Sequence, residues 1–345
     1  MLLAGDIGGT KTVVALLEAD TAQAGESVGA LRTVRQEYYP SQKHASLESI
    51  LADFLQGSPG SGPTIQAACF GVAGAIHQGT CKTTNLPWQM TESELAATLN
   101  CDPRRVKLLN DVEAAAYGML FLKSEELLDL NPAWEDHGGG NIAVAAAGTG
   151  LGEAILHWDG EKHHPLASEG GHCSFAPQSE LEVELWRHLR AKFNGHVSYE
   201  RILSGQGFFD LFDFLRQSNH YRGSQALTEG LAAANDTGER NGIITRMGLE
   251  QNDPLCLATL GTFLSIYGAE AGNLALKCMA SGGVYLAGGI APKMLAAFKL
   301  GTFLEGFMAK GRFSKMLRTA RVRLALNQQT GLIGAGYYAR NHLTV

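Results

Sequence analysis

Two segments with the pattern strand, glycine-rich turn, strand constrain the fold of this chain more than any other feature. The first spans residues 3–17, where apolar runs flank Gly8-Gly9, and the second spans residues 142–156, where similar runs flank Gly148-Thr149-Gly150. Glycine supplies the positive φ angles of a tight turn and leaves backbone N–H groups open to an anion. The repeat predicts a duplicated fold with a phosphate-binding turn in each half and a cleft between the halves.

The residues around the first turn exclude two familiar phosphate-binding loops. A P-loop needs Gly-Lys-Ser/Thr at the start of a helix, and a dinucleotide-binding motif needs a helix after its last glycine. β-branched residues follow the turn here, and they favour a strand. An ordinary hairpin would explain the two glycines, but it does not explain why the polar residues Asp6, Thr10 and Lys11 flank the turn. We therefore favour phosphate binding for this turn.

Length and charge narrow the classes of function. A chain of 345 residues exceeds what one core usually fills, so two domains are expected. The net charge of −6 argues against non-specific binding to nucleic acid or to an anionic membrane. No run approaches the roughly 18 apolar residues of a membrane span, and Asp6 comes too early for a signal peptide. The six cysteines include no C-x-x-C pair, which argues against a zinc site or a disulfide framework. We expect a cytoplasmic protein.

The order of the predicted elements is that of an α/β fold. Three early strands precede a helix at 47–55, and further strands are predicted at 64–74 and 106–109. Helices are predicted at 91–99, 113–120, 180–193 and 208–215, with a long one from Pro254 to about Met279. A strand at 322–326 and a helix from Gly331 complete the pattern.

Asn110-Asp111 follows a short apolar strand and precedes a helix. Ligands of open α/β sheets bind at this type of position, where the carboxyl end of a strand meets a helix N-terminus. An Asp just before a helix is, however, most often an N-cap. The pattern alone therefore leaves both roles open for Asp111.

Five motifs in order resemble those of the bacterial glucokinase family. They are Asp6-Ile7-Gly8-Gly9-Thr10, Leu109-Asn110-Asp111, Gly148-Thr149-Gly150-Leu151-Gly152, Glu169-Gly170-Gly171-His172 with the following Phe175-Ala176-Pro177, and Leu286-Ala287-Gly288-Gly289-Ile290. The resemblance implies a two-domain α/β fold of the actin-like (ribonuclease H-like) sugar kinase type with an interdomain cleft. It implies a small domain of residues 1–110 plus 327–345 and a large domain of residues 111–326. The clustered cysteine motif of the related zinc-containing kinases does not occur.

The resemblance also implies an activity, in which ATP phosphorylates the 6-hydroxyl of glucose. Asp111 is then the general base, since a sugar hydroxyl is a weak nucleophile that must lose its proton. The expected sugar ligands are Asn85, Asn110, Asp111, Glu169, His172 and Glu200. For Glu200 a solvated residue on a short helix is an equally good interpretation. Gln206 stands where we expect proline in related glucokinases.

For the nucleotide, the resemblance implies backbone contacts with phosphate from both glycine turns and a second glycine pair near the adenosine. The expected residues are Gly8, Gly9, Thr10, Lys11, Gly148, Thr149, Gly150, Gly288 and Gly289, with Asp6 as the Mg²⁺ ligand. A homodimer is expected. Two alternatives stay open: a kinase of the same fold for another hexose, and a sugar sensor or regulator. Such regulators usually carry a DNA-binding domain before the first hairpin, which here starts at residue 3, and a sensor would not need Asp111.

Overall fold

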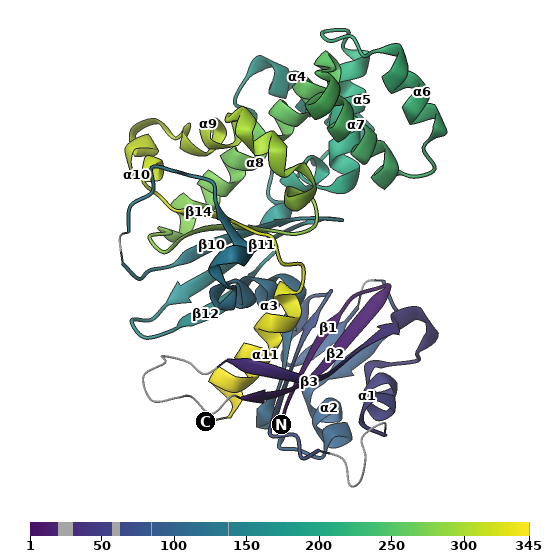
Figure 1. Cartoon of the computed structure of the whole chain (residues 1–345), viewed down its shortest axis with the longest axis vertical. Coiled ribbons are helices and arrows are strands. Elements are labelled where there is room, and N and C mark those ends of the chain that lie inside the picture. Colours follow the sequence, from purple (N-terminus) through teal and green to yellow (C-terminus); the bar gives the residue numbers. More distant parts are fainter. Residues whose placement is uncertain (20–29, 57–62, 84, 137, 345) are drawn as a thin grey trace. The chain divides into compact units, whose positions relative to one another are not determined.

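The computed structural model describes residues 1–345 except 20–29, 57–62, 84, 137 and 345. The chain divides into two compact units (Figure 1). The first comprises Met1–Ser124, His163–Ala167 and Asn327–Val345, and the second comprises Glu125–Lys162 and Ser168–Leu326. The helix that follows Asn110 lies in the first unit. The predicted boundary between a small and a large domain at residue 110 stays a prediction.

The first unit is built on a five-stranded sheet. Its order is β3 (Leu31–Pro40), β2 (Lys11–Ala19), β1 (Leu2–Ile7), β4 (Ala67–Val72) and β8 (Val106–Asn110). Strands β1 and β2 form the predicted antiparallel hairpin, and β1, β4 and β8 are parallel. In register, Asp6 lies beside Gly71, and Gly71 lies beside Leu109. The carboxyl ends of these three strands therefore lie at one edge of the sheet.

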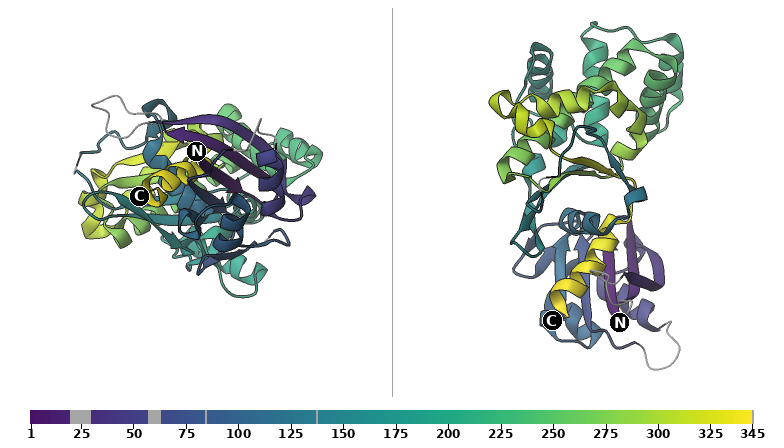
Figure 2. Two further views of the ribbon diagram at one scale, coloured as in Figure 1. Left: turned by 90° about the horizontal axis from the view of Figure 1, so that it is seen from below. Right: turned by 60° about the vertical axis from the view of Figure 1, so that its left-hand side comes forward.

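Helices cover both faces of this sheet. Helices α1 (Leu47–Gln56) and α2 (Glu92–Leu99) share one apolar core with the sheet, in which Phe54, Phe70 and Leu95 are buried. Helices α3 (Asp111–Gly118) and α11 (Thr330–Leu343) lie together against the other face (Figures 1 and 2). The remaining elements of the unit are short: β5 (Ile76–His77), β6 (Thr80–Lys82), β7 (Gln89–Thr91), and 3-10 turns at Ser41–Lys43, Pro103–Arg105 and Met119–Phe121.

Helices α3 and α11 approach each other so closely that their backbones touch. A Cβ atom on Gly118 would lie 2.0 Å from the carbonyl oxygen of Thr330, and one on Gly334 would lie 1.8 Å from that of Ala114. No side chain fits at either position. The two glycines therefore fix the place of α3 and of the residues at its N-terminus.

Four strands of the second unit repeat an order found in the first: β11 (Leu151–Trp158), β10 (Ile142–Ala147), β13 (Gly283–Ala287) and β14 (Val322–Ala325) correspond to β2, β1, β4 and β8. Strand β9 (Leu127–Asp129) adds to the β14 edge, and β12 (His163–Ser168) pairs with β11 in the same six-stranded sheet. Strand β10 is antiparallel to β11 and parallel to β13, as β1 is to β2 and β4. The predicted duplication and the α/β fold class are confirmed.

A layer of helices packs on this sheet in the second unit (Figure 1). The predicted long helix is α8 (Pro254–Cys278), which has the length and apolarity of a membrane span but is mostly buried in the unit's core. The other helices are α4 (Glu180–Lys192), α5 (Gly205–Gln217), α6 (Gln225–Ala233), α7 (Thr237–Gln251), α9 (Thr302–Met308) and α10 (Ser314–Arg318). Short 3-10 segments lie at Ser124–Glu126, Gly170–His172, Tyr199–Arg201, Ala291–Leu300 and Gly311–Phe313.

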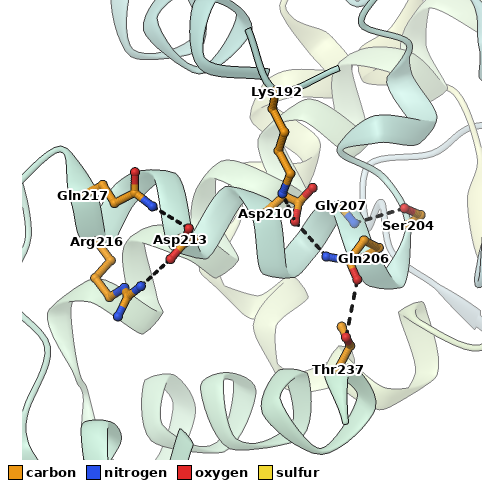
Figure 3. A network of polar contacts seen from close by, with 9 residues as sticks. All are labelled: Lys192, Ser204, Gln206, Gly207, Asp210, Asp213, Arg216, Gln217 and Thr237. Atoms are coloured by element: carbon orange, nitrogen blue, oxygen red, sulfur yellow. Dashed lines mark hydrogen bonds and ion pairs between the residues drawn. The ribbon is translucent and has the colours of Figure 1, made fainter. Parts of the chain in front are cut away.

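Gln206, at the position where proline was expected, takes part in a polar network (Figure 3). Its amide donates to the buried carboxylate of Asp210 over 2.7 Å, and Lys192 lies 2.8 Å from the same carboxylate. The Thr237 hydroxyl donates to the Gln206 amide oxygen over 3.4 Å. A proline could make neither of the two bonds of Gln206. The glutamine thus joins α5 to the start of α7, and Asp210 joins α5 to the end of α4.

Candidate active site

The tip of the first hairpin is fixed by Ser41. Its hydroxyl donates to the carbonyl of Gly8 over 2.7 Å, and its N–H donates to the carbonyl of Thr10 over 3.0 Å. The turn closes with a 3.0 Å bond from the Gly8 N–H to the carbonyl of Lys11. Sequence reasoning did not identify Ser41, because nothing in the sequence marks a serine that lies far along the chain from the turn.

The glycines of the turns are needed for a different reason than predicted. Within the described part of the chain, none of Gly8, Gly9, Gly148 and Gly150 has a positive φ, so the prediction of left-handed turn residues was wrong. Close approach takes its place. A Cβ atom on Gly9 would lie 2.8 Å from that of Asn85, which puts this expected sugar ligand beside the first hairpin.

Because Ser41 holds the Gly8 carbonyl, we expect Ser41→Ala to loosen the hairpin without changing its fold. The expected result is a rise in the KM for ATP of roughly 3- to 10-fold, equivalent to the loss of one hydrogen bond of about 1 kcal/mol. The KM for the sugar should change little. Steady-state kinetics with each substrate varied in turn checks this, and an equal rise in both KM values would contradict it.

Asn110, and not Asp111, is the N-cap of α3. The Asn110 side-chain oxygen accepts from the Val112 N–H at 2.9 Å, and the Glu113 carboxylate accepts from the Asn110 N–H at 2.9 Å. This capping box fills the N-cap role that the sequence left open for Asp111. The Asn110 amide also donates to the carbonyl of Gly74 over 3.2 Å. Both ends of the Asn110 side chain are thus engaged within the protein, and its role as a sugar ligand stays a prediction.

Asp111 is the first residue of α3, and its carboxylate accepts from the Val112 N–H at 3.0 Å. The N-terminal end of the helix dipole favours its charged form. Asp6 lies at the same edge of the sheet and interacts electrostatically with the Asp111 carboxylate. Burial and then the Asp111 carboxylate raise the pKa of Asp6 to about 6, against the opposing effect of Lys11. A cation at Asp6 would relieve this repulsion.

The expected Mg²⁺ ligand fits the chemistry of that ion. Mg²⁺ prefers one or two carboxylates and completes its shell with water and phosphate oxygens. A half-buried carboxylate beside a second one, at the sheet edge that carries the first glycine turn, meets this requirement. Among the described residues there is no group of three or more acidic, His or Cys side chains that could hold a metal by itself.

In the second unit, three backbone turns meet at the hairpin Gly148–Gly150. The Gly205 N–H donates to the Gly148 carbonyl over 2.9 Å, and the Ile290 N–H donates to the Ala147 carbonyl over 3.1 Å. Gly288 has a φ of +83°, and a Cβ atom there would lie 2.2 Å from the Ala147 carbonyl oxygen. Only glycine fits. The two predicted nucleotide motifs of this unit, 148–150 and 288–289, are therefore adjacent.

A cavity of about 970 Å³ opens beside these turns. Gly148, Thr149, Gly205, Gly289 and Ile290 line one part of it. The rest comes from α6, α7 and the segment after β13, including Asn241, Thr245, Arg246, Glu250, Lys293 and Met294. This volume is of the size of known cofactor sites.

Sequence reasoning missed the α7 side of the cavity. One signal could have found the helix: Asp236 is its N-cap and accepts from the Glu239 N–H at 2.8 Å, and the Glu239 carboxylate accepts from the Asn235 N–H. No motif, however, marks the residues that line the cavity.

The expected sugar ligands of the second unit lie together beside the same hairpin. The Nε2 atom of His172 is 3.8 Å from the carboxylate of Glu169, and its Nδ1 atom is 3.9 Å from that of Glu200. Glu200 accepts from the Leu151 N–H at 3.0 Å, and a Cβ atom on Gly150 would lie 2.4 Å from its carboxylate. Glu200 is thus held against β11, unlike a solvated helix residue. Glu169 and His172 are exposed and able to contact a ligand.

Comparisons with known proteins show which family this chain resembles over its whole length. The family described as "Glucokinase" matches residues 3–342. A glucokinase from Synechocystis sp. is 38% identical, covering 98% of this chain and 97% of the relative. The crystal structure of a glucokinase from an Antarctic psychrotroph superposes with a TM-score of 0.83 at 30% identity, covering 99% of this chain and 98% of that one.

A ROK family glucokinase from Streptomyces griseus, solved with glucose and AMPPNP, superposes with a TM-score of 0.62 at 19% identity, covering 98% of this chain and 99% of that one. This likeness shows the fold alone. The match to the family over nearly the whole length, together with the close curated relatives, establishes the conclusion that this chain belongs to the glucokinase family.

Proposed function

We propose that this protein transfers the γ-phosphoryl group of ATP to the 6-hydroxyl of D-glucose, with Asp111 as the general base. The observation that carries the proposal is the position of Glu169, His172 and Glu200 against the second glycine hairpin. Residues suited to vicinal hydroxyls thus lie directly beside backbone suited to phosphate. The relatives named glucokinase, and the neighbour solved with glucose and AMPPNP, support the same reaction.

Glucose recognition is assigned to carboxylates, an imidazole and an amide. A carboxylate accepts from two hydroxyls, which suits the neighbouring hydroxyls of a hexose. Glu200, fixed by the Leu151 N–H, keeps its remaining acceptor sites for the sugar, and His172 lies between it and Glu169. Asn85 and Asn110 are the proposed contacts from the first unit.

Asp111 is proposed to take the proton of the 6-hydroxyl as the phosphoryl group arrives. The helix N-terminus favours the charged form of its carboxylate, and the cap on α3 is supplied by Asn110. In phosphoryl transfer the protein contributes chiefly position and charge, so one carboxylate within hydrogen-bond reach of the hydroxyl suffices as the base.

ATP is assigned to the hairpin turns and the cavity beside them. Backbone N–H groups at Gly8–Lys11 and Gly148–Gly150 would donate to phosphate oxygens. The cavity between Gly289-Ile290 and α7 would hold the adenosine, and Lys293 and Arg246 lie on its wall. Mg²⁺ bound by Asp6 would neutralise the charge that develops on the phosphates.

The raised pKa of Asp6 makes a prediction about pH. Below pH about 6 this carboxyl is protonated and cannot bind Mg²⁺. We expect kcat/KM for MgATP to fall about tenfold per pH unit below that value, because this parameter reports groups of the free enzyme. A kinetic pH profile from 5 to 8 checks this decrease of kcat/KM. Asp6→Asn should have low activity at every pH and should not show the decrease. The same decrease in that variant as in wild type would contradict the assignment.

A coupled assay with a panel of hexoses and phosphoryl donors tests the function itself. We expect glucose with ATP to give the highest kcat/KM. Faster turnover of mannose, fructose or an N-acetyl sugar would favour the alternative kinase, and sugar binding without turnover would favour a sensor. The family also supports a cytoplasmic homodimer, and light scattering of the purified protein checks the dimer.

A further inference from the structure

Glu153 is a buried carboxyl group that the proposed reaction does not use. It lies on β11, two residues after Leu151, and only 1% of it is exposed. Among the described residues no N–H or O–H group donates to either of its carboxylate oxygens, and the Glu270 carboxylate lies within hydrogen-bond reach of a protonated Glu153. An ionised carboxylate in such surroundings is strongly unfavourable, whereas a protonated one is tolerated. The native surroundings of Glu153 therefore suit a neutral group.

The charges around Glu153 act in the same direction. Glu270 on α8 is also 1% exposed, but it has partners: Lys277 lies 3.3 Å away, and the Asn273 amide donates to it over 2.8 Å. Lys277, the cation of this cluster, thus already pairs with Glu270. Burial and then the Glu270 charge raise the pKa of Glu153 to about 7, and Lys277 opposes them only in part.

Glu153 touches the loop that carries two of the proposed sugar ligands. A Cβ atom on Gly170 would lie 2.1 Å from the Glu153 carboxylate, and one on Gly171 would lie 2.0 Å from the carbonyl oxygen of Leu151. The turn therefore rests directly on β11, with the Glu153 carboxyl beneath it. Gly170 and Gly171 separate Glu169 from His172.

We propose that Glu153 is a positioning residue for glucose: as a neutral carboxyl group it supports the Gly170–Gly171 turn from below and so sets the positions of Glu169 and His172. This inference rests on the proposed function. Loss of the proton would place a second negative charge beside Glu270, and water or a cation could reach that charge only if the turn moved. Glucose affinity therefore falls when Glu153 ionises, while ATP binding at the other turns is retained.

Other titrating groups near Glu153 must be separated from it. From α8 it faces Glu270, Lys277 and the Tyr267 hydroxyl, which donates to the Ala145 carbonyl. From the loop it faces the turn that Ser168 and Cys173 flank, and the Cys173 thiol interacts with Lys277. His172 lies at the end of the same turn and is a further titratable group of the loop. A substitution at Glu153 isolates its own contribution, because these groups stay in place.

The test measures the KM for glucose, the KM for ATP and kcat from pH 6 to 9 in wild type and in Glu153→Gln. In wild type we expect the KM for glucose to rise roughly 5- to 30-fold as pH rises through 7 to 8, the equivalent of one or two weakened hydrogen bonds. Glutamine has the shape of the neutral acid, so Glu153→Gln should keep a low KM for glucose throughout. The KM for ATP should not follow the same curve.

Two further variants sharpen the result. Glu270→Gln removes the neighbouring charge, which should move the rise in KM for glucose to lower pH. Glu182→Gln changes another buried glutamate, one that accepts from the Gln178 N–H over 2.7 Å on a different element, and should leave the profile as in wild type. A Glu153→Gln profile identical to wild type would overturn the proposal, as would a Glu153→Gln protein that fails to fold, since the neutral form is argued to be the native one.

Hydrogen exchange separates this proposal from the proposed function. Amides of residues 168–173 should lose protection between pH 6 and 9 in wild type, after correction for intrinsic exchange, and keep it in Glu153→Gln. A protein that did not phosphorylate glucose at any pH would contradict the proposed function. Hydrogen exchange would still test the role of Glu153, because it does not depend on activity. Equal protection in both proteins at every pH would reject it.

Discussion

Asp111→Asn is expected to reduce turnover by about 10²- to 10⁴-fold, or ~3–5 kcal/mol of transition-state stabilisation, while the protein melts as wild type does. The amide cannot accept the proton of the 6-hydroxyl. It can still accept from the Val112 N–H, as the carboxylate does. Glucose should bind more weakly but measurably. Turnover at saturating ATP and glucose, with a thermal melt of both proteins, is the measurement.

The neighbouring residue provides the matched control. Asn110 is the cap of α3, so Asn110→Ala should lower the free energy of unfolding by about 1 kcal/mol. Because Asn110 is also a proposed sugar contact, its variant should raise the KM for glucose as well. A loss of stability at residue 110, with turnover at saturating glucose largely kept, and a loss of turnover without loss of stability at residue 111 would separate the cap from the base. A folded Asp111→Asn protein with near-normal turnover would refute the base and direct the search to Glu169.

Gly334→Ala should lower the free energy of unfolding by about 3 kcal/mol or more, because the new methyl group would meet the Ala114 carbonyl oxygen at 1.8 Å. Backbone cannot give way as a side chain can, so α3 and α11 must separate. Turnover should fall as well, since Asp111 is the first residue of α3. Thermal melts and kinetics of the same preparation measure both effects.

Gly261→Ala is the control for this prediction. Gly261 lies in α8, and a Cβ atom there would meet only the Thr302 methyl group at an ordinary 3.9 Å. The same substitution should there be neutral or stabilise the helix by up to about 1 kcal/mol. Equal melting temperatures for Gly334→Ala and wild type would mean that the two helices are not in backbone contact.

Predictions from the sequence succeeded where they depended on a local pattern of residues along the chain. Apolar periodicity and the two glycine turns predicted the hairpins β1–β2 and β10–β11 and the repeated sheet order. Pro254 and the apolar run after it predicted α8. The motifs of the resemblance carried the family assignment.

The predictions that failed concern contacts between distant segments. The turn glycines were explained by φ, but Gly9 and Gly150 are needed because Asn85 and Glu200 lie against them. Asp111 was considered as a cap, because the sequence does not show that Asn110 and Glu113 already form the box.

The burial of Glu153 was not predicted for a similar reason. A glutamate in a strand is usually at the surface, and only the packing of α8 and the Gly170 turn buries this one.

The distribution of the first unit along the chain has a consequence for its biosynthesis. On the ribosome, β1, β2 and β4 emerge early, but α11, which covers one face of their sheet with Leu332, Ala335 and Ala339, follows only after the whole second unit has been translated. Domains generally fold as units during synthesis, and exposed apolar surface promotes aggregation. The second unit is thus able to complete its fold first. Until α11 has been made, the apolar side chains of Leu2, Ala4 and Leu17 lack the helix that covers them, so the nascent first unit is prone to aggregation during this interval.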